Sequence, residues 1–137
     1  MNERAGRQQA LAALGAERFV SLTTFRRTGV AVSTPVWIVR DGDALAVLTP
    51  AESGKVKRLR NDPRVQLRPC GRTGKVPPGT DPVDGVAEIV ADEATAARLT
   101  GLVQAEYGLE YRVTMLVERI AARRHKPRVL LRITLDG

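Results

Sequence analysis

The segment Leu48–Val65, LTPAESGKVKRLRNDPRV, carries the strongest signals of both structure and binding in this chain. Its pattern predicts a strand that ends at Thr49 and a short helix over Gly54–Asn61. The dipeptide Asp62-Pro63 stops this helix, because proline disfavours helical backbone in the residue before it. Val65 then begins another strand.

The first turn of the predicted helix contains lysines where carboxylates are usual. Lys55 and Lys57 lie there, where the helix dipole disfavours each cation by about 0.3–1 kcal/mol. A bound phosphate would supply the missing negative charge. It would meet backbone N–H groups, the hydroxyls of Thr49 and Ser53, and an ammonium group. We therefore predict a phosphate site here, and a solvated basic helix is the alternative.

Short strands surround this segment. Period-two patterns predict hairpin-linked strands over Phe19–Phe25, Val30–Val39 and Ala44–Thr49, and further strands over Val65–Pro69, Val83–Val90 and Val129–Leu135. Pro35 cannot donate to a strand ladder, so its strand should be at a sheet edge or carry a bulge. Residues Gly71–Pro82 are rich in glycine and proline and predict a surface loop.

Three longer helices complete the pattern. They are expected over Glu3–Leu14, from Asp92 to Tyr107, and over Glu110–Arg123, and the last should bury Val113, Leu116, Val117 and Ile120. Gly108 separates the second helix from the third. The predicted class is α+β, with a six-stranded antiparallel barrel and peripheral helices. At 137 residues and 14.9 kDa, one domain over residues 1–137 is expected.

The net charge of +7 predicts an anionic partner. Seven basic residues lie between Lys55 and Arg72 against the single carboxylate of Asp62, and six lie between Arg119 and Arg132 with no acid. Nucleic acid, a phosphorylated cofactor or an acidic surface could each balance this charge. Aromatic residues are 4% of the chain, which disfavours a single-strand nucleic-acid binder.

Several classes of protein are excluded by composition. A single cysteine, Cys70, and a single histidine, His125, exclude an internal disulfide framework and the usual zinc sites. No apolar run approaches the roughly 20 residues of a membrane span, so a soluble cytoplasmic protein is expected. We interpret Cys70 as a small buried hydrophobe and His125 as an exposed loop residue. Without a nucleophile–base pair, an enzyme of this sequence would take its chemistry from a cofactor.

Short motifs in a fixed order also match a known family. They are STPVW at residues 33–37, the segment Leu48–Val65, PC at 69–70 and VDGVA at 83–87. The chain resembles the split β-barrel flavin and deazaflavin oxidoreductases of the pyridoxamine-phosphate-oxidase-like superfamily. Within that superfamily it is similar to small actinobacterial oxidoreductases that use coenzyme F420. The likeness extends from Phe19 to Leu135.

The resemblance implies an FMN-binding type of split barrel, and a homodimer with a cofactor groove between its subunits. It implies that Thr49, Ser53, Lys55 and Lys57 hold the cofactor phosphate and that Pro35, Val36 and Trp37 line the ring. Charge alone suggests that Arg58 and Arg60 reach the acidic oligoglutamate tail of F420. FMN is the alternative cofactor. No side chain is assigned as a catalytic acid or base.

The expected activity is hydride transfer between the deazaflavin and a small, planar unsaturated substrate. Vitamin B6 oxidation is not expected, because the second strand is apolar from Val36 to Val39 and the chain end lacks the Arg/His substrate motif of those oxidases. The alternatives are an FMN-dependent oxidoreductase, a cofactor-storage or sensing protein without turnover, and a nucleic-acid-binding module. Specific nucleic-acid binding and membrane association are not expected.

Overall fold

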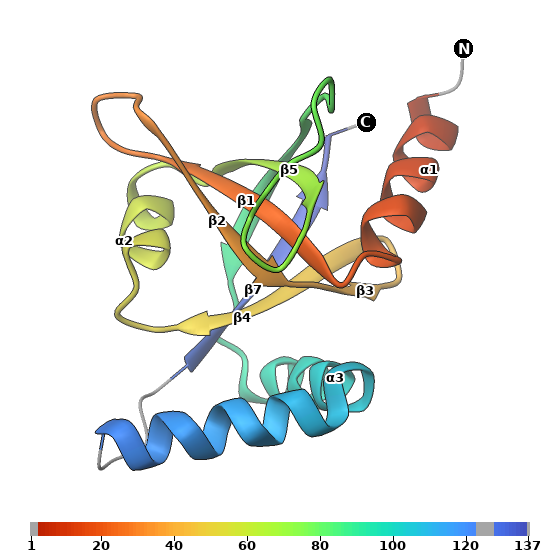
Figure 1. The fold of residues 1–137 in the computed structure, drawn as a ribbon. Helices are drawn as coiled ribbons and strands as arrows, with labels where there is room; N and C mark the ends of the chain where they lie inside the picture. The colour runs from red at the N-terminus through yellow and green to blue at the C-terminus, as the bar shows by residue number, and fades with distance from the viewer. Residues whose placement is uncertain (1–2, 123–127, 137) are drawn as a thin grey trace.

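A computed structural model describes residues 3–122 and 128–136, with side chains for residues 5–109, 112 and 128–136. Its centre is one antiparallel sheet in the order β2-β1-β5-β6-β7-β4-β3 (Figure 1). The strands are β1 (Phe19–Phe25), β2 (Ala31–Trp37), β3 (Val39–Asp41), β4 (Ala44–Pro50), β5 (Arg64–Cys70), β6 (Val83–Ile89) and β7 (Arg128–Leu135). The α+β split barrel expected from the sequence is confirmed.

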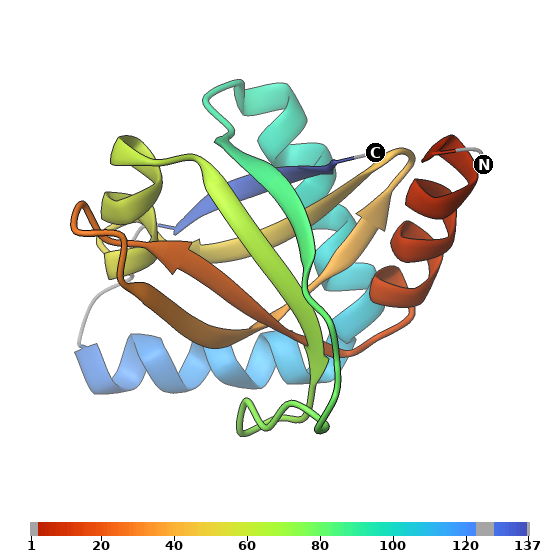
Figure 2. The ribbon, with the colours of Figure 1, turned by 90° about the horizontal axis from the view of Figure 1, so that it is seen from above.

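The two edge strands of this sheet are neighbours in sequence. β2 ends at Trp37 and β3 begins at Val39, so only Ile38 separates the two edges. The sheet must therefore curl until its edges approach one another at Ile38, as Figure 2 shows from above. The expected edge position of Pro35 is confirmed, because β2 pairs only with β1.

The strand count differs from the expected six. The segment Val30–Val39 forms two strands, because the chain changes partner at Ile38. Trp37 is opposite Phe19 on β1, whereas Val39 is opposite Ala46 on β4. The Ile38 backbone N–H and C=O lie 2.8 and 2.6 Å from the hydroxyl of Tyr107, which takes the place of a strand partner.

Two helices lie at opposite ends of the curled sheet and the longest helix lies along its outside (Figures 1 and 2). They are α1 (Glu3–Gly15), α2 (Gly54–Asn61) and α3 (Glu93–Ala122). Leu11 and Leu14 of α1 are buried in the main core. The first part of α3 packs on the outer face of the sheet through a second cluster of Val39, Ala46, Leu99, Val103, Tyr107 and Leu130.

The predicted break after Tyr107 is confirmed. Gly108 interrupts α3 with φ 44° and ψ −113°, a backbone conformation that residues with a Cβ rarely adopt. Our predictions for the side chains of Val113, Leu116, Val117 and Ile120, and for His125, lie outside the described residues. Cys70 is buried at the end of β5, as expected, and desolvation is the main cause that raises the pKa of its thiol. No helix within the described ranges is long and apolar enough to span a membrane.

Candidate functional site

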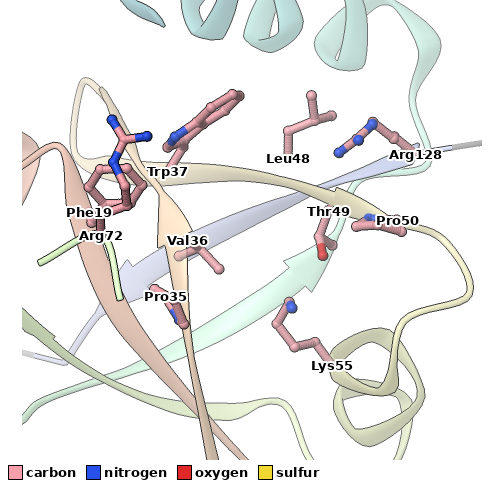
Figure 3. Close-up of a pocket in the computed structure, with 10 residues that line it drawn as sticks. All are labelled: Phe19, Pro35, Val36, Trp37, Leu48, Thr49, Pro50, Lys55, Arg72 and Arg128. Carbon is pink, nitrogen blue, oxygen red and sulfur yellow. The ribbon is translucent and has the colours of Figure 1, made fainter. Parts of the chain in front are cut away.

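A pocket of about 230 Å³ lies where β2 and β4 face each other without pairing. Among the described residues, β3 pairs with β4 only at residues 44–46, so the later part of β4 has no strand partner on that side. The pocket is lined by Phe19, Pro35, Val36, Trp37, Leu48, Thr49, Pro50, Lys55, Arg72 and Arg128 (Figure 3). The split in the barrel therefore forms the pocket, and five of the predicted cofactor residues meet there.

Thr49 places a hydroxyl in this pocket that has no partner within the described structure. The residue is 1% exposed, and its Oγ1 makes no hydrogen bond to any described residue. Leaving a buried polar group unsatisfied costs about 1–3 kcal/mol. A ligand atom that hydrogen-bonds to Oγ1 would remove this penalty, so the hydroxyl is a candidate binding position.

Lys55 approaches the same position from the first turn of α2 (Figure 3). Its side chain is half-buried, and no carboxylate among the described residues forms an ion pair with it. Burial, with a smaller contribution from the Arg58 guanidinium, lowers the pKa of the Lys55 ammonium. An anion beside Thr49 would compensate this charge.

The N-terminus of α2 adds to the positive field around Lys55. Ser53 caps the helix by accepting a 3.5 Å hydrogen bond from the Val56 N–H, and the first turn contains no acidic residue. Ser53 itself does not line the pocket. The Ser53 hydroxyl caps the helix instead. Lys55 is the α2 residue that lines the pocket.

The remaining basic residues of α2 are directed elsewhere. Lys57 and Arg60 are exposed and do not line the pocket. Arg58 is half-buried, and its Nε donates a 2.6 Å hydrogen bond to Thr24 Oγ1 on β1. Burial, followed by the charge of Arg26, lowers the pKa of Arg58. These cations make a basic surface beside the pocket, while Lys55 is inside it.

Aromatic side chains occupy the opposite side of the pocket. Trp37 stacks on Tyr107, with ring centroids 4.9 Å apart and planes inclined by 16°. The Arg72 guanidinium lies 5.5 Å from the centroid of the Phe19 ring. Figure 3 shows Phe19, Trp37 and Arg72 together, apart from Thr49 and Lys55. The pocket thus has a polar side and an aromatic side.

The described lining holds three cations, Lys55, Arg72 and Arg128, and no carboxylate, histidine or cysteine. No group of three His, Cys, Asp or Glu side chains in the described ranges is placed to hold a metal ion. This lining can bind an anionic ligand and position a flat ring, but it offers no acid–base pair of its own.

Sequence reasoning missed several lining residues: Phe19, Leu48, Pro50, Arg72 and Arg128. Arg128 reaches the site because it is opposite Pro50 in the β4–β7 register. Phe19 reaches it because it is opposite Trp37. Both arginines belong to the two basic segments of the sequence, and that excess charge was the only available signal for them.

The chain matches a known protein family over most of its length. A family model described as pyridoxamine 5'-phosphate oxidase matches residues 7–137. No curated protein matches the chain in sequence.

Solved structures share the fold at low identity. A conserved hypothetical protein from Mycobacterium tuberculosis aligns with a TM-score of 0.68 and 23% identity, over 100% of this chain and 82% of its own. An FAD-binding protein from Mesorhizobium loti aligns with a TM-score of 0.58 and 17% identity, over 95% and 87%. The heme storage protein HutZ from Vibrio cholerae aligns with a TM-score of 0.61 and 12% identity, over 100% and 92%. The same fold is therefore used for chemically different ligands.

Proposed function

Because this chain belongs to the pyridoxamine 5'-phosphate oxidase family, we propose that the pocket between β2 and β4 binds a phosphate-bearing deazaflavin, coenzyme F420. The protein is then an oxidoreductase. It transfers a hydride between that cofactor and a small, planar unsaturated molecule. When bound, the deazaflavin supplies the redox chemistry, and the protein supplies binding and orientation.

The observation that carries this proposal is the pairing of Thr49 with Lys55. A buried hydroxyl without a partner and a half-buried ammonium without a carboxylate line one side of one pocket. Both groups hydrogen-bond to phosphate oxygens, and the N-terminus of α2 adds a partial positive charge. One phosphate could therefore accept a hydrogen bond from each of these two groups.

The other side of the pocket suits a flat ring. Pro35 and Val36 present apolar surface, and Trp37 presents an indole. An apolar wall orients a ring and excludes water from it, while leaving the ring's own chemistry unchanged. The same apolar lining argues against a vitamin B6 substrate, whose polar ring substituents would find few partners on β2.

The cations outside the phosphate position favour a ligand with several negative charges. Lys57, Arg58 and Arg60 follow Lys55 along α2 and form the basic surface beside the pocket. We propose that this surface receives the acidic oligoglutamate tail of F420. FMN is the second candidate, because it also has a phosphate and a similar ring, and an FAD-binding protein shares the fold.

We also propose that two chains form the complete site. The pocket of about 230 Å³ is smaller than the roughly 300–1,000 Å³ of typical ligand sites. On α3, Leu102 is 36% exposed and Leu109 is 75% exposed, which provides apolar surface for a second copy. A homodimer would enlarge the groove that one chain provides.

Isothermal titration of the purified protein with F420 and with FMN, side by side, tests the cofactor assignment. We expect both to bind, F420 more tightly, and inorganic phosphate to compete with each. Tighter binding of FMN would replace F420 by the second candidate. Absence of binding for both would overturn the proposed function.

A further inference from the structure

We propose that Tyr107 is a positioning residue. It holds Trp37 and Ile38, the hinge residue between β2 and β3, and so sets the affinity of the pocket for the ring of its ligand. This inference rests on the proposed function, since it assumes that one side of the pocket binds a ring and the other binds a phosphate. Tyr107 supports the ring side only. Tyr107 itself does not line the pocket. It acts through Trp37, which does.

The hydroxyl of Tyr107 is the centre of a buried hydrogen-bond cluster. It accepts the Ile38 N–H at 2.8 Å and lies 2.6 Å from the Ile38 carbonyl oxygen and 2.8 Å from the Arg18 carbonyl oxygen. A hydroxyl has one proton, so it donates to one of these carbonyls at a time. One side chain on α3 thereby fixes the residue at which the two sheet edges meet.

The ring of Tyr107 holds Trp37, the residue that precedes Ile38. It is 3% exposed and stacks on Trp37 at 4.9 Å, and the Arg18 guanidinium lies 5.2 Å from the centre of the Tyr107 ring. Tyr107 thus contacts both Trp37 and Arg18 through its ring, and we call these three residues the Tyr107 column. Trp37 stays half-buried, and it still contributes to the pocket wall shown in Figure 3.

The phosphate side of the pocket does not depend on this column. Thr49 belongs to β4 and Lys55 to α2, and within the described structure neither forms a hydrogen bond or a ring contact with Tyr107. Loss of the Tyr107 hydroxyl should therefore weaken binding of the ring and spare binding of phosphate. A merely structural role for Tyr107 would weaken both.

The experiment uses the full chain and three measurements on Tyr107→Phe. Trp37 is the only tryptophan, so acrylamide quenching of intrinsic fluorescence reports directly on its exposure. Riboflavin, which lacks phosphate, probes the ring side, and inorganic phosphate probes the other. We expect faster quenching, a riboflavin Kd raised about threefold to tenfold through a loosened contact, and a phosphate Kd within about twofold of wild type.

Two further variants keep the test decisive. Val103→Ala removes buried volume from the same helix and cluster without touching the hydroxyl contacts, and we expect it to leave riboflavin affinity unchanged. Arg18→Gln alters an exposed side chain over the Tyr107 ring, and we expect it to raise acrylamide quenching and the riboflavin Kd less than Tyr107→Phe does. This variant keeps the test available if Tyr107→Phe fails to fold.

Unchanged quenching in Tyr107→Phe, equal weakening of both probes, or the same loss in Val103→Ala would each overturn the inference. Should wild-type protein bind neither of these probes and neither F420 nor FMN, the proposed function fails. The acrylamide measurement then decides separately whether Tyr107 holds Trp37.

Discussion

Lys55 and Thr49 are both placed at a cost to the free protein. The Lys55 ammonium loses hydration in the pocket beside another cation, which lowers its pKa, and the Thr49 hydroxyl is buried without a partner among the described residues. Residues that stabilise only the fold rarely combine these features, because each is destabilising until a ligand arrives. This combination of an unsatisfied hydroxyl and a desolvated ammonium supports our proposal of a phosphate position.

Replacement of Lys55 by alanine should reduce affinity for the cofactor about 10- to 150-fold, because a charge-assisted hydrogen bond is worth roughly 1.5–3 kcal/mol. Calorimetric titration measures this loss. Lys75→Ala is the matched control, since Lys75 is an exposed lysine outside the pocket. Equal losses of affinity in the two variants would show that Lys55 acts only through its long-range charge and not through a direct contact with phosphate.

Thr49→Val should have opposite effects on the free protein and on binding. The methyl group replaces a buried hydroxyl without a partner, so the free energy of unfolding should rise by about 1 kcal/mol. Affinity for a phosphate-bearing ligand should fall about threefold to tenfold, because one hydrogen bond is lost. Urea denaturation and titration measure the two changes. A less stable variant would show that the hydroxyl has a structural partner.

At the scale of elements, Asp41 connects β3 to α3 and β7. Its carboxylate accepts two hydrogen bonds from Arg98, at 2.7 and 3.1 Å, and Arg132 lies 3.8 Å away. The Arg98 hydrogen bond is the main cause that lowers the pKa of Asp41 from its ordinary value of 3.8. Because the folded pKa is the lower one, this stabilisation is complete above about pH 4 and is lost as the pH falls through the folded pKa.

Asp41→Asn should therefore lower the free energy of unfolding by about 0.5–1 kcal/mol at pH 7, a modest value because Arg98 is half-exposed. The difference from wild type should shrink below about pH 4. Urea denaturation at pH 7 and pH 3 measures it, with Asp43→Asn, an exposed neighbour, as control. A difference that persists unchanged at pH 3 would contradict the ion-pair explanation.

The order and type of elements could be predicted from local signals. Proline and glycine at Pro63 and Gly108 mark ends of helical segments, and period two marks strands. The division of the second strand could not be predicted in this way. It depends on Tyr107, which is 69 residues from Ile38 in sequence. Local patterns contain no information about such a distant partner.

Local signals could predict the candidate site only where its residues are close in sequence, whereas Pro35, Val36 and Trp37 followed from the family resemblance. The β4–α2 connection brings Thr49 and Lys55 together within a few residues, so a helix-dipole argument could find both. Arg72, Arg128 and Phe19 enter through strand register and a loop between strands. Register follows from packing of the whole sheet, which a single sequence does not display.

For the whole molecule, the open pocket and the exposed leucines of α3 predict a dimer. Sedimentation velocity at micromolar concentration should give a single dimeric species, with an interface that buries more than about 1,000 Å². Because cofactor binding in a shared groove couples to association, dilution should weaken both together. A monomer that binds the cofactor at full affinity would contradict the two-chain site.

We propose that the cofactor binds in the pocket between β2 and β4, where Trp37, the only tryptophan, forms part of the wall. Titration of wild-type protein with coenzyme F420, followed by Trp37 fluorescence, tests this location. We predict saturable quenching at one cofactor per chain, with a midpoint shifted about 10- to 150-fold in Lys55→Ala. Binding detected by calorimetry with no change in Trp37 fluorescence, or an absence of saturable binding, would contradict it.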